Sequence, residues 1–494
     1  ASATAFAAEY QDMTYHELDP VEYPLGHALA AEPVFVTEAI TREMIERIED
    51  SVEEGKPFFA YMSHFATHAP HSVDPRFATN PKYAGMSGDT LAFATMVEGI
   101  DQSTADIIAR LEELGVAEDT LVIVFGDNGT DAKPRGPGNP PTLAMSNPLR
   151  GEKGMRHEGG VRVPFIFSWA KPVAGNSHQT RFPIIAAQKC GDIIAGQDLF
   201  PTICAAAELA LPTLDDGGNP LVIDGHSIES YLKGVAGTHR PQKLLTHFPT
   251  PHRSDFFSIL HEGDWKLIYN YNNAASSTAT EVPLGTFELF KLDEDPYEAD
   301  NRADASSANY APQKVMTMAR EMVAEIDRLD GEYPILKAAD AALASIGLPS
   351  DEGDTHPIVL PAVAGVDTDS DGLDDNSEDP NRNGRVDAGE TDADNPNTDG
   401  DNITDGEEVS LGTDPLNSTS YFFATAGPVS GESFEITWPS APGTSFTIRS
   451  SDDMQQWNTI EAMSVSASPG DTTSHMVSAT NGVRRFYRVE LETP

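Results

Sequence analysis

The chain has 494 residues, of which 78 are Asp or Glu and 32 are Lys or Arg, so its formal net charge is −46 at pH 7. Such a charge argues against binding to nucleic acid or to an anionic membrane surface, because both partners are themselves negative. The length predicts several domains, and an ordinary hydrophobic fraction of 39% allows a sizeable core. No apolar run is long enough to span a bilayer, which predicts a chain without a membrane span.

The cysteines and the first residues bear on the compartment. Cys190 and Cys204 are too few for a disulfide framework. Two buried thiols are the favoured interpretation, and the alternative is a bridge closing a loop of about 15 residues, which contributes ~3 kcal/mol in the chain-entropy model. Residues 1–8 are small and apolar but lack basic residues, so they do not form a recognisable signal peptide.

The N-terminal part of the chain alternates between helical and strand-like patterns. A helix is predicted over 37–54 because Ile40, Met44 and Ile48 share one face, and the same spacing predicts a longer helix over 89–114. Short apolar runs predict buried strands over 57–63, 120–125 and 163–169. This alternation predicts an α/β fold in which helices flank a mostly parallel sheet.

Polar residues that could form a site follow the strand predicted over 120–125. Asp127 and Asn128 come directly after it, where open α/β sheets place their ligands, and their oxygens suit a hard divalent cation. Lys153, in a Gly-flanked loop, supplies a positive charge for an oxyanion. Asp-Asn-Gly is also a common turn sequence, and a loop lysine is often only solvated. Together they predict a site for a sulfate or phosphate ester, with the loop 131–148 selecting the substrate.

The same residues, with segments on either side, resemble the sulfatase family of the alkaline-phosphatase superfamily. The resemblance runs from about Val36 to about Ala303. The segments that carry it, in the family's order, are 57–70, 95–129, Lys153 with Glu158-Gly-Gly-Val-Arg162, Asp198-Leu-Phe-Pro-Thr202, 263–268 and 288–296. It implies an alkaline-phosphatase-like fold and the hydrolysis of sulfate esters.

The resemblance also implies roles for individual residues. It assigns His68 and Lys153 as catalytic groups, Asp127 and Asn128 as metal ligands, and His247 and His252 as substrate-binding residues. A histidine can donate a proton to the leaving oxygen near neutral pH, and His64 and His71 are nearby alternatives to His68. Lys153 would offset negative charge on the transferred group. The implied active-site metal is Ca²⁺, with Mg²⁺ possible.

One departure from the family concerns the nucleophile. The family uses a formylglycine made from Cys or Ser in a C/S-x-P/A-x-R motif near the N-terminus, and no such motif stands near the N-terminus of the 494 residues. Neither Cys190 nor Cys204 has the required neighbours, and the family's opening aspartate pair and Gly-Lys-x-His segment are also absent. The sequence therefore predicts a partial α/β core that lacks the nucleophile and half of the metal shell. We expect such a chain to hydrolyse sulfate esters very poorly or not at all.

Changes of pattern divide the chain into five predicted segments. After residue 244, short strands and a helix over about 312–329 predict an α+β subdomain, and the last part alternates apolar and polar residues between turns, as a small all-β module does. The segments are the partial sulfatase-like α/β core (1–238), the α+β subdomain (239–347), a linker (348–365), acidic calcium-binding repeats (366–416) and the all-β module (420–494).

The acidic segment contains three copies of a calcium-loop pattern. Oxygen-bearing side chains occupy positions 1, 3, 5, 9 and 12 of each copy, and position 6 is Gly372, Gly384 or, in the third copy, Asn402. The candidate ligands are Asp367, Asp369, Asp371, Asp375 and Glu378; Asp379, Asn381, Asn383, Asp387 and Glu390; and Asn397, Asp399, Asp401, Asp405 and Glu408. The run resembles thrombospondin type 3 repeats and predicts several bound Ca²⁺ ions. A solvated acidic linker is the alternative.

These features predict a metal-dependent sulfuric ester hydrolase that is secreted to an extracellular or periplasmic space. Its expected substrate is a sulfated small molecule, such as an aryl sulfate, or a sulfated polysaccharide. The nearest alternative is a phosphate or phosphonate ester hydrolase of the same superfamily. A different class is a non-catalytic, calcium-dependent binding protein whose working parts are the repeats and the β module.

Overall fold

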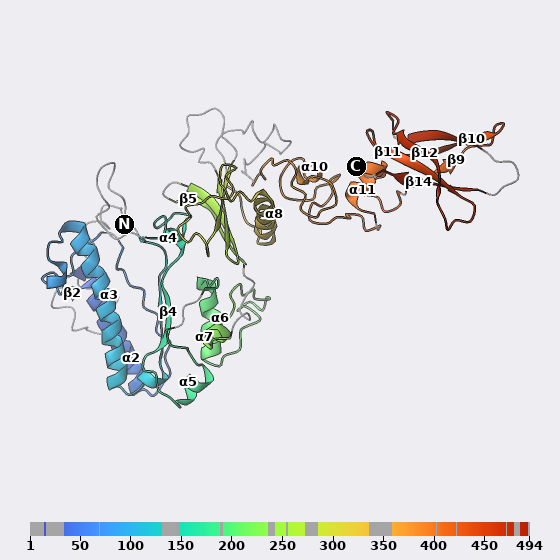
Figure 1. Ribbon diagram of the computed structural model, residues 1–494. Coiled ribbons are helices and arrows are strands. Elements are labelled where there is room, and N and C mark those ends of the chain that lie inside the picture. The colour runs from blue at the N-terminus through green and yellow to red at the C-terminus, as the bar shows by residue number, and fades with distance from the viewer. Residues whose placement is uncertain are drawn as a thin grey trace. The chain divides into compact units, whose positions relative to one another are not determined.

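The computed structural model divides the chain into two compact units (Figure 1). One comprises Ala1–Leu244, His261–Trp265 and Lys291–Ala299, and the other comprises Leu245–Leu260, Lys266–Phe290 and Asp300–Pro494. The structure describes residues 14–15, 34–68, 70–130, 146, 148–187, 191–235, 243–252, 255–271, 285–334, 358–401, 403–420, 422–470, 472–478 and 485–492. Within these ranges, none of the helices combines the length and the apolar character that crossing a lipid bilayer requires.

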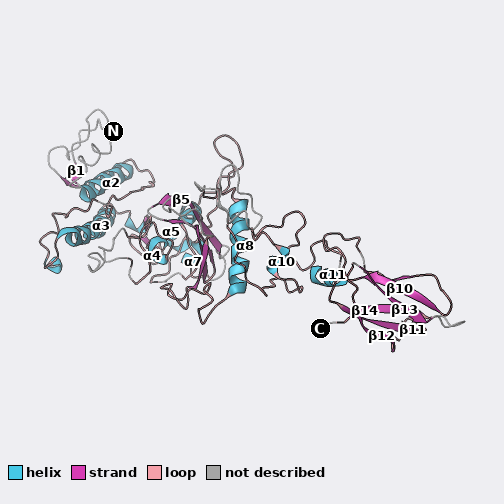
Figure 2. Cartoon of the chain, turned by 90° about the horizontal axis from the view of Figure 1, so that it is seen from above, coloured by secondary structure: helices cyan, strands magenta, loops and turns pink. Residues whose placement is uncertain are grey.

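Two long helices, α2 (Val36–Glu53) and α3 (Gly88–Glu113), lie side by side in the first unit (Figures 1 and 2). Their shared face is apolar, and Ile48 of α2 and Leu111 of α3 form a buried cluster with Ala117. Each large side chain buried in this way contributes about 1.5–3 kcal/mol, so the contact stabilises both helices. The helices predicted from the apolar spacing are therefore present.

The strands β3 (Leu121–Phe125) and β4 (Phe165–Trp169) form a two-stranded sheet that is antiparallel, with Ile123 opposite Phe167. The prediction of a mostly parallel sheet is therefore wrong for the described residues. A parallel pair needs a long crossover connection, usually a helix. Between β3 and β4 the described residues hold only the short helix α4 (Glu158–Val161), and the chain returns to the strand it left.

The segment 57–63, predicted as a buried strand, forms no strand. Phe59 and Tyr61 are exposed by 74% and 80%, and only Phe58 of its aromatic side chains packs on the cluster of Ile48 and Leu111. The apolar composition suggested burial, but a strand also needs a neighbour for its backbone hydrogen bonds, and the described residues supply none here.

Short elements complete the first unit. The carboxylate of Asp198 is fully buried and accepts the N–H groups of Ala195 (2.8 Å) and His226 (2.9 Å), which fixes the start of α6. Cys204 on α6 is a buried free thiol, whereas Cys190 lies outside the described residues. The elements are β1 (Thr14–Tyr15), β2 (Val34–Phe35), η2 (Pro81–Tyr83), η3 (Ala117–Asp119), α5 (Ser177–Arg181), η4 (Gly196–Asp198), α6 (Leu199–Ala206) and α7 (Glu229–Leu232).

A four-stranded sheet and one helix follow. The strands, in spatial order, are β5 (Lys243–His252), β6 (Asp255–Glu262), β7 (Trp265–Tyr271) and β8 (Thr286–Lys291). Helix α8 (Pro312–Arg328) lies beside them in both views (Figures 1 and 2). Val315, Met318, Met322 and Ile326 recur at helical spacing and are all buried, so one face of α8 is apolar.

The C-terminal module consists of two three-stranded antiparallel sheets. Their spatial orders are β13-β10-β9 and β12-β11-β14, in which the strands are β9 (Thr425–Ala426), β10 (Ser433–Pro439), β11 (Ser445–Ser451), β12 (Thr459–Ser466), β13 (Thr472–Ser478) and β14 (Phe486–Leu491). Trp438 of one sheet and Phe446 of the other meet edge to face at 5.6 Å in a buried apolar cluster. Burial alternates along part of β10, where Ile436 and Trp438 are buried and Glu435 is exposed, as expected for packed sheets.

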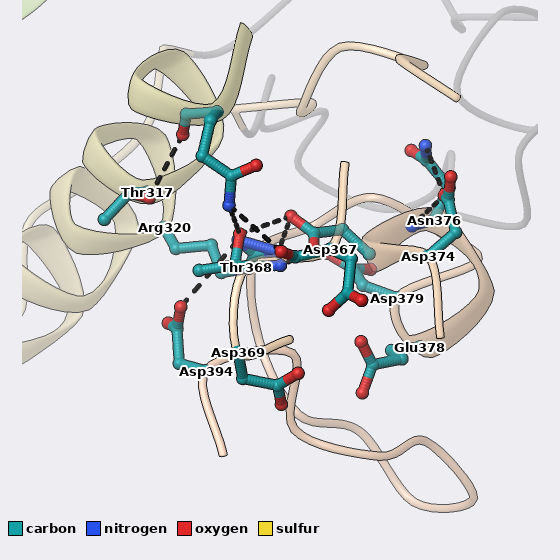
Figure 3. Close-up of polar contacts among 12 residues, drawn as sticks. Thr317, Arg320, Asp367, Thr368, Asp369, Asp374, Asn376, Glu378, Asp379 and Asp394 are labelled. Carbon is teal, nitrogen blue, oxygen red and sulfur yellow. Dashed lines mark hydrogen bonds and ion pairs between the residues drawn. The ribbon is translucent and has the colours of Figure 1, made fainter. Parts of the chain in front are cut away.

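Two Arg–Asp pairs fasten the acidic repeats to α8. Arg320 of α8 is 7% exposed and forms an ion pair with Asp375, which is fully buried. Figure 3 shows the same arginine beside Thr368 of the repeats. In the second pair the arginine belongs to the repeats and the aspartate to α8. Arg385 binds both carboxylate oxygens of Asp327, at 2.7 and 2.8 Å. The repeats contain the short helices α10 (Asp375–Glu378) and α11 (Asp405–Leu411).

Arg320→Ala should destabilise the second unit by about 3–5 kcal/mol, because it leaves a buried carboxylate without its cation. Chemical denaturation of the full chain measures the change. Arg328→Ala is the control, since Arg328 sits on the same helix with a side chain 59% exposed, and its loss should change stability by less than about 0.5 kcal/mol. Equal effects of the two substitutions would contradict the anchoring role of Arg320.

Candidate functional site

The turn that follows β3 lies against the loop that carries the lysine. Backbone N–H groups donate to carbonyls from Gly126 to Pro164 (2.9 Å), from Gly129 to Gly160 (3.0 Å) and from Lys153 to Thr130 (3.0 Å). Within this turn Asp127 is exposed and Asn128 is half-buried. The backbone of Lys153 therefore lies next to the predicted metal ligands Asp127 and Asn128, in one region of the first unit.

Glycines make this close approach possible. A Cβ on Gly129 would lie 1.9 Å from the carbonyl oxygen of Gly159, and a Cβ on Gly160 would lie 2.2 Å from the carbonyl oxygen of Met155. Backbone atoms cannot give way cheaply at such distances. Gly129 is thus required where the turn meets the lysine loop, and Gly160 where that loop packs on its own backbone.

Glu298, which sequence reasoning did not single out, also holds this loop. Its side chain is 1% exposed, and its carboxylate accepts the backbone N–H of Glu158 at 2.7 Å. The carbonyl of Glu298 accepts a hydrogen bond from the guanidinium of Arg150 at 3.0 Å, and the Glu158 carboxylate lies 3.3 Å from Nε2 of His261. The signal that could have indicated this role is the Asp-Pro-Tyr-Glu segment 295–298, next to the part that resembles the family.

Of the three neighbouring histidines, two pack against α3. Nε2 of His64 lies 3.4 Å from Oγ of Ser103, and burial lowers the pKa of His64. The ring of His71 meets that of Phe93 edge to face at 5.7 Å. His68, in contrast, is exposed, so it is the most accessible of the three to a solute. That His68 shares a site with Lys153 stays a prediction.

His247 makes scaffold contacts within the second unit. Its Nε2 lies 2.7 Å from the carbonyl oxygen of Glu332, which can only accept, so Nε2 carries the proton. Its Nδ1 lies 2.8 Å from Oγ of Ser258, which in turn contacts the hydroxyl of Tyr271 at 2.9 Å. With both ring nitrogens engaged, we assign His247 a structural part, and its predicted contact with substrate has no support in this geometry. The side chain of His252 lies outside the described residues.

The three acidic loops share one set of backbone contacts. The side chains at positions 1, 3 and 5 accept N–H groups from residues further along the same loop, as in Ser370 to Asp367 (2.7 Å), Asn383 to Asp379 (3.1 Å) and Gly400 to Asn397 (2.7 Å). The backbone at position 4 adopts the left-handed conformation in all three loops, with φ of 65° at Ser370, 57° at Arg382 and 78° at Gly400. Gly372 and Gly384 at position 6 are also left-handed, as the pattern predicts, and Asn402 lies outside the described residues.

Three groups of carboxylates in the described repeats have oxygen atoms within 4.8 Å of one another. They are Asp367, Asp369 and Asp371; Asp371, Glu378 and Asp405; and Asp399, Asp401 and Glu408. Glu378 and Glu408 are at most 1% exposed, and in each the Oε2 atom is buried without a hydrogen-bond donor. Buried carboxylate oxygens without donors are costly, and a divalent cation is the partner that suits them.

Electrostatics support the same reading of these groups. Burial, with repulsion from acidic neighbours, raises the pKa of Glu378 to about 8 and that of Glu408 to about 7. Burial, with repulsion from Asp371, raises the pKa of Asp369 to about 6. Each carboxylate is thus held where its charged form is disfavoured unless a cation lies beside it. The donor set of hard oxygens fits Ca²⁺.

The carboxylates at position 9 depart from the predicted pattern. Asp375 accepts the N–H and the hydroxyl of Thr368, both at 2.8 Å, in addition to its ion pair with Arg320. Asp387 is exposed and accepts the side-chain amides of Asn381 (2.9 Å) and Asn383 (2.8 Å). Asp405 forms a group with Asp371 and Glu378 of the first loop, and its charge also acts on Glu408 of its own loop.

Comparison with known proteins gives a consistent result for the N-terminal part. Residues 3–209 match the sulfatase family model. A sulfatase from Formosa agariphila is 30% identical over 296 residues, covering 55% of this chain and 47% of that protein. Human arylsulfatase A is 26% identical over 308 residues, covering 58% of this chain and 52% of that protein. The chain thus spans about half the length of these curated relatives.

Solved structures were also compared. The crystal structure of Ps i-CgsB in complex with k-i-k-neocarrahexaose is 20% identical, covers 63% of this chain and 60% of its own, and has a TM-score of 0.43. The family match, by contrast, rests on sequence and covers the histidine motif, the Asp127 turn and the lysine loop. Residues 3–209 are therefore similar to the sulfatase family.

Gly129→Ala should destabilise the first unit by at least about 2 kcal/mol, because a methyl group cannot occupy the space taken by the Gly159 carbonyl. Thermal unfolding of the full chain measures the effect. Gly191→Ala is the matched control, since a Cβ there meets nothing within 4 Å, and it should change stability by less than about 0.5 kcal/mol. A neutral Gly129→Ala would show that the turn and the lysine loop are not in close contact.

Proposed function

We propose that this chain carries the sulfatase region of a secreted, metal-dependent sulfuric ester hydrolase, followed by calcium-binding repeats. The observation that carries the first part is the contact of the Asp127 turn with the Lys153 loop, inside the residues that match the sulfatase family. The clusters of buried carboxylates carry the second part.

In this proposal each residue of the ester site has one task. Asp127 and Asn128 offer oxygen ligands to Ca²⁺ or Mg²⁺ at the start of the turn. Lys153 binds an oxygen of the sulfate group and offsets the charge that builds up as the ester bond breaks. His68 delivers a proton to the leaving alcohol. Glu298 and the glycine pair position the lysine loop, so they act through Lys153 and not on the substrate.

We infer that these 494 residues do not supply the nucleophile, because no formylglycine motif stands near their N-terminus. The one stretch that fits the pattern, Ser146-Asn-Pro-Leu-Arg150, leads into the lysine loop, where Oγ of Ser146 donates to the carbonyl of Gly159 at 2.7 Å. Charge stabilisation and proton donation alone cannot replace an attacking group. We therefore propose that hydrolysis requires a segment with a C-x-P-S-R sequence upstream of this sequence. A phosphate or phosphonate ester hydrolase is the nearest rival, since a metal and a lysine would hold either anion.

The substrate class is a sulfated polysaccharide or an aryl sulfate. Similar proteins include an arylsulfatase from human and N-acetylgalactosamine-6-sulfatases from mouse and dog, the latter two at 29% and 30% identity. Their names span small aryl esters and amino-sugar esters. An acidic chain repels free polyanions, so the binding of a sulfated glycan would rely on local cations such as Lys153 and the active-site metal.

The purified chain should hydrolyse 4-nitrophenyl sulfate with no more than a residual acceleration, on the order of 10³–10⁴ over water. Joining the upstream segment, with its cysteine matured to formylglycine, should restore turnover. In the restored enzyme Lys153→Ala should lower kcat about 10²–10³-fold. Lys171→Ala is the control, because Lys171 is an exposed lysine paired with Glu118.

Two outcomes would contradict this account of the ester site. Robust aryl sulfate turnover by the chain alone, lost in Lys153→Ala, would mean that a nucleophile lies within these residues. A restored enzyme that hydrolyses 4-nitrophenyl phosphate faster than the sulfate would favour the phosphatase rival.

Calorimetric titration of the full chain should detect several Ca²⁺ ions with Kd of about 10⁻⁴–10⁻³ M, the range of extracellular calcium modules. Glu408→Gln should remove one of them, because it deletes a buried ligand. Glu407→Gln changes the adjacent, exposed residue of α11 by the same charge and should leave the titration unchanged. A wild-type chain that gives no calcium heat and no change in circular dichroism would refute the calcium array.

A further inference from the structure

The first and third repeats are in direct contact. The backbone N–H of Gly406, in the first turn of α11, donates to Oδ2 of Asp371 at 2.6 Å. A Cβ on Gly406 would lie 2.3 Å from the carbonyl oxygen of Asp371, so only glycine allows this approach. The start of α11 is therefore packed on the fifth position of the first loop, across 35 residues of sequence.

This contact brings three carboxylates from two repeats together. Oxygen atoms of Asp371, Glu378 and Asp405 lie within 4.8 Å of one another. Glu378 is 1% exposed and Asp405 is 0% exposed, and Oε2 of Glu378 is buried without a donor. Three negative charges at this separation, largely out of water, repel one another strongly unless a cation lies among them.

The other two carboxylates of the group are held in place by the protein. Oδ1 of Asp371 accepts the N–H of Leu373 at 2.7 Å, and the carboxylate of Asp405 accepts the N–H and the hydroxyl of Thr398. A carboxylate oxygen has more than one lone pair, so these bonds orient the groups and leave capacity for a metal. A preorganised set of oxygens binds a cation at lower entropic cost.

Asp375, the carboxylate at position 9 of the first loop, forms an ion pair with α8. The carboxylate of Asp375 is engaged by the guanidinium of Arg320, and a metal ion beside this arginine would be repelled. Asp375 and Asp405 make the same contacts with Thr368 and Thr398, so the arginine is what distinguishes the two carboxylates. Asp405, for its part, is absent from the group formed by its own loop, which consists of Asp399, Asp401 and Glu408. The first loop therefore has no carboxylate at position 9 that a metal could use, and Asp405, at position 9 of the third loop, lies beside its other ligands.

We propose that the ion bound by the first loop is completed across the repeats by Asp405 of the third. This assignment rests on the proposed calcium binding, and it adds which ion Asp405 serves. The ion would then join Asp367, Asp369, Asp371 and Glu378 of the first loop to α11 of the third. The first and third loops load calcium as one unit, because the first site is incomplete until the third repeat is docked.

A pair of double variants tests the proposal by calorimetric titration of the full chain with Ca²⁺. The single variants are Asp405→Asn, Glu378→Gln and Glu408→Gln, with Glu407→Gln as the control of equal charge. If Asp405 serves the first ion, Asp405→Asn with Glu378→Gln should lose no more ions than Glu378→Gln alone. Asp405→Asn with Glu408→Gln should lose one ion more than Glu408→Gln alone.

The opposite pattern overturns the proposal. If Asp405 serves the ion of its own loop, the double variant with Glu408→Gln will match Glu408→Gln, and the one with Glu378→Gln will lose an extra ion. A wild-type chain that binds no calcium would instead refute the calcium array itself, which separates the two failures.

A second measurement decides the question if Asp405→Asn does not fold, as judged by circular dichroism without calcium. A crystal structure of the calcium-loaded wild-type chain should place an oxygen of Asp405 about 2.3–2.6 Å from the ion bound by Asp367 and Asp369. An ion in the first loop without Asp405 in its coordination shell would overturn the proposal.

Discussion

Burial of negative charge is the constraint on which the second unit depends. Its acidic repeats must pack on a helix and on each other, which takes carboxylates out of water at a cost that only a cation or several donors can offset. The chain meets this cost in two ways. Where the repeats face α8, Arg320 neutralises the fully buried Asp375. Where the repeats face each other, the carboxylates gather in groups with unused oxygens, as at Glu378.

The first unit also buries carboxylates, beside the loop that carries Lys153. Glu158 and Glu298 are buried beside the lysine loop, and their partners belong to the protein: a backbone N–H, Arg150 and His261. Such a permanent network suits a loop that must present Lys153 at a fixed place. Glycine at 129 and 160 serves the same end, because it lets two backbones approach more closely than any side chain permits.

Local patterns in the sequence predict local structure well here, and pairings between distant segments poorly. The apolar spacing locates α2 and α3, and the glycine at position 6 of the loops is left-handed as expected. The pairing of β3 with β4 is antiparallel because the connection between them holds no long helix, which apolar runs do not reveal. The ion pair of Asp375 likewise depends on Arg320, more than 50 residues away in sequence, and no spacing rule within one loop could indicate it.

The two ways of neutralising charge meet at α8. Arg320 and Arg385 are built into the protein and hold the repeats on the helix whatever the solution contains. Calcium, in contrast, is present in proportion to its concentration, and any ligand that binds only the folded array stabilises it by linkage. With the loops empty, the carboxylates that face each other repel, and the two arginines alone oppose that repulsion. Under the proposed calcium binding, occupancy of the loops adds to the two arginine pairs and should make the packing of the acidic array on α8 firmer.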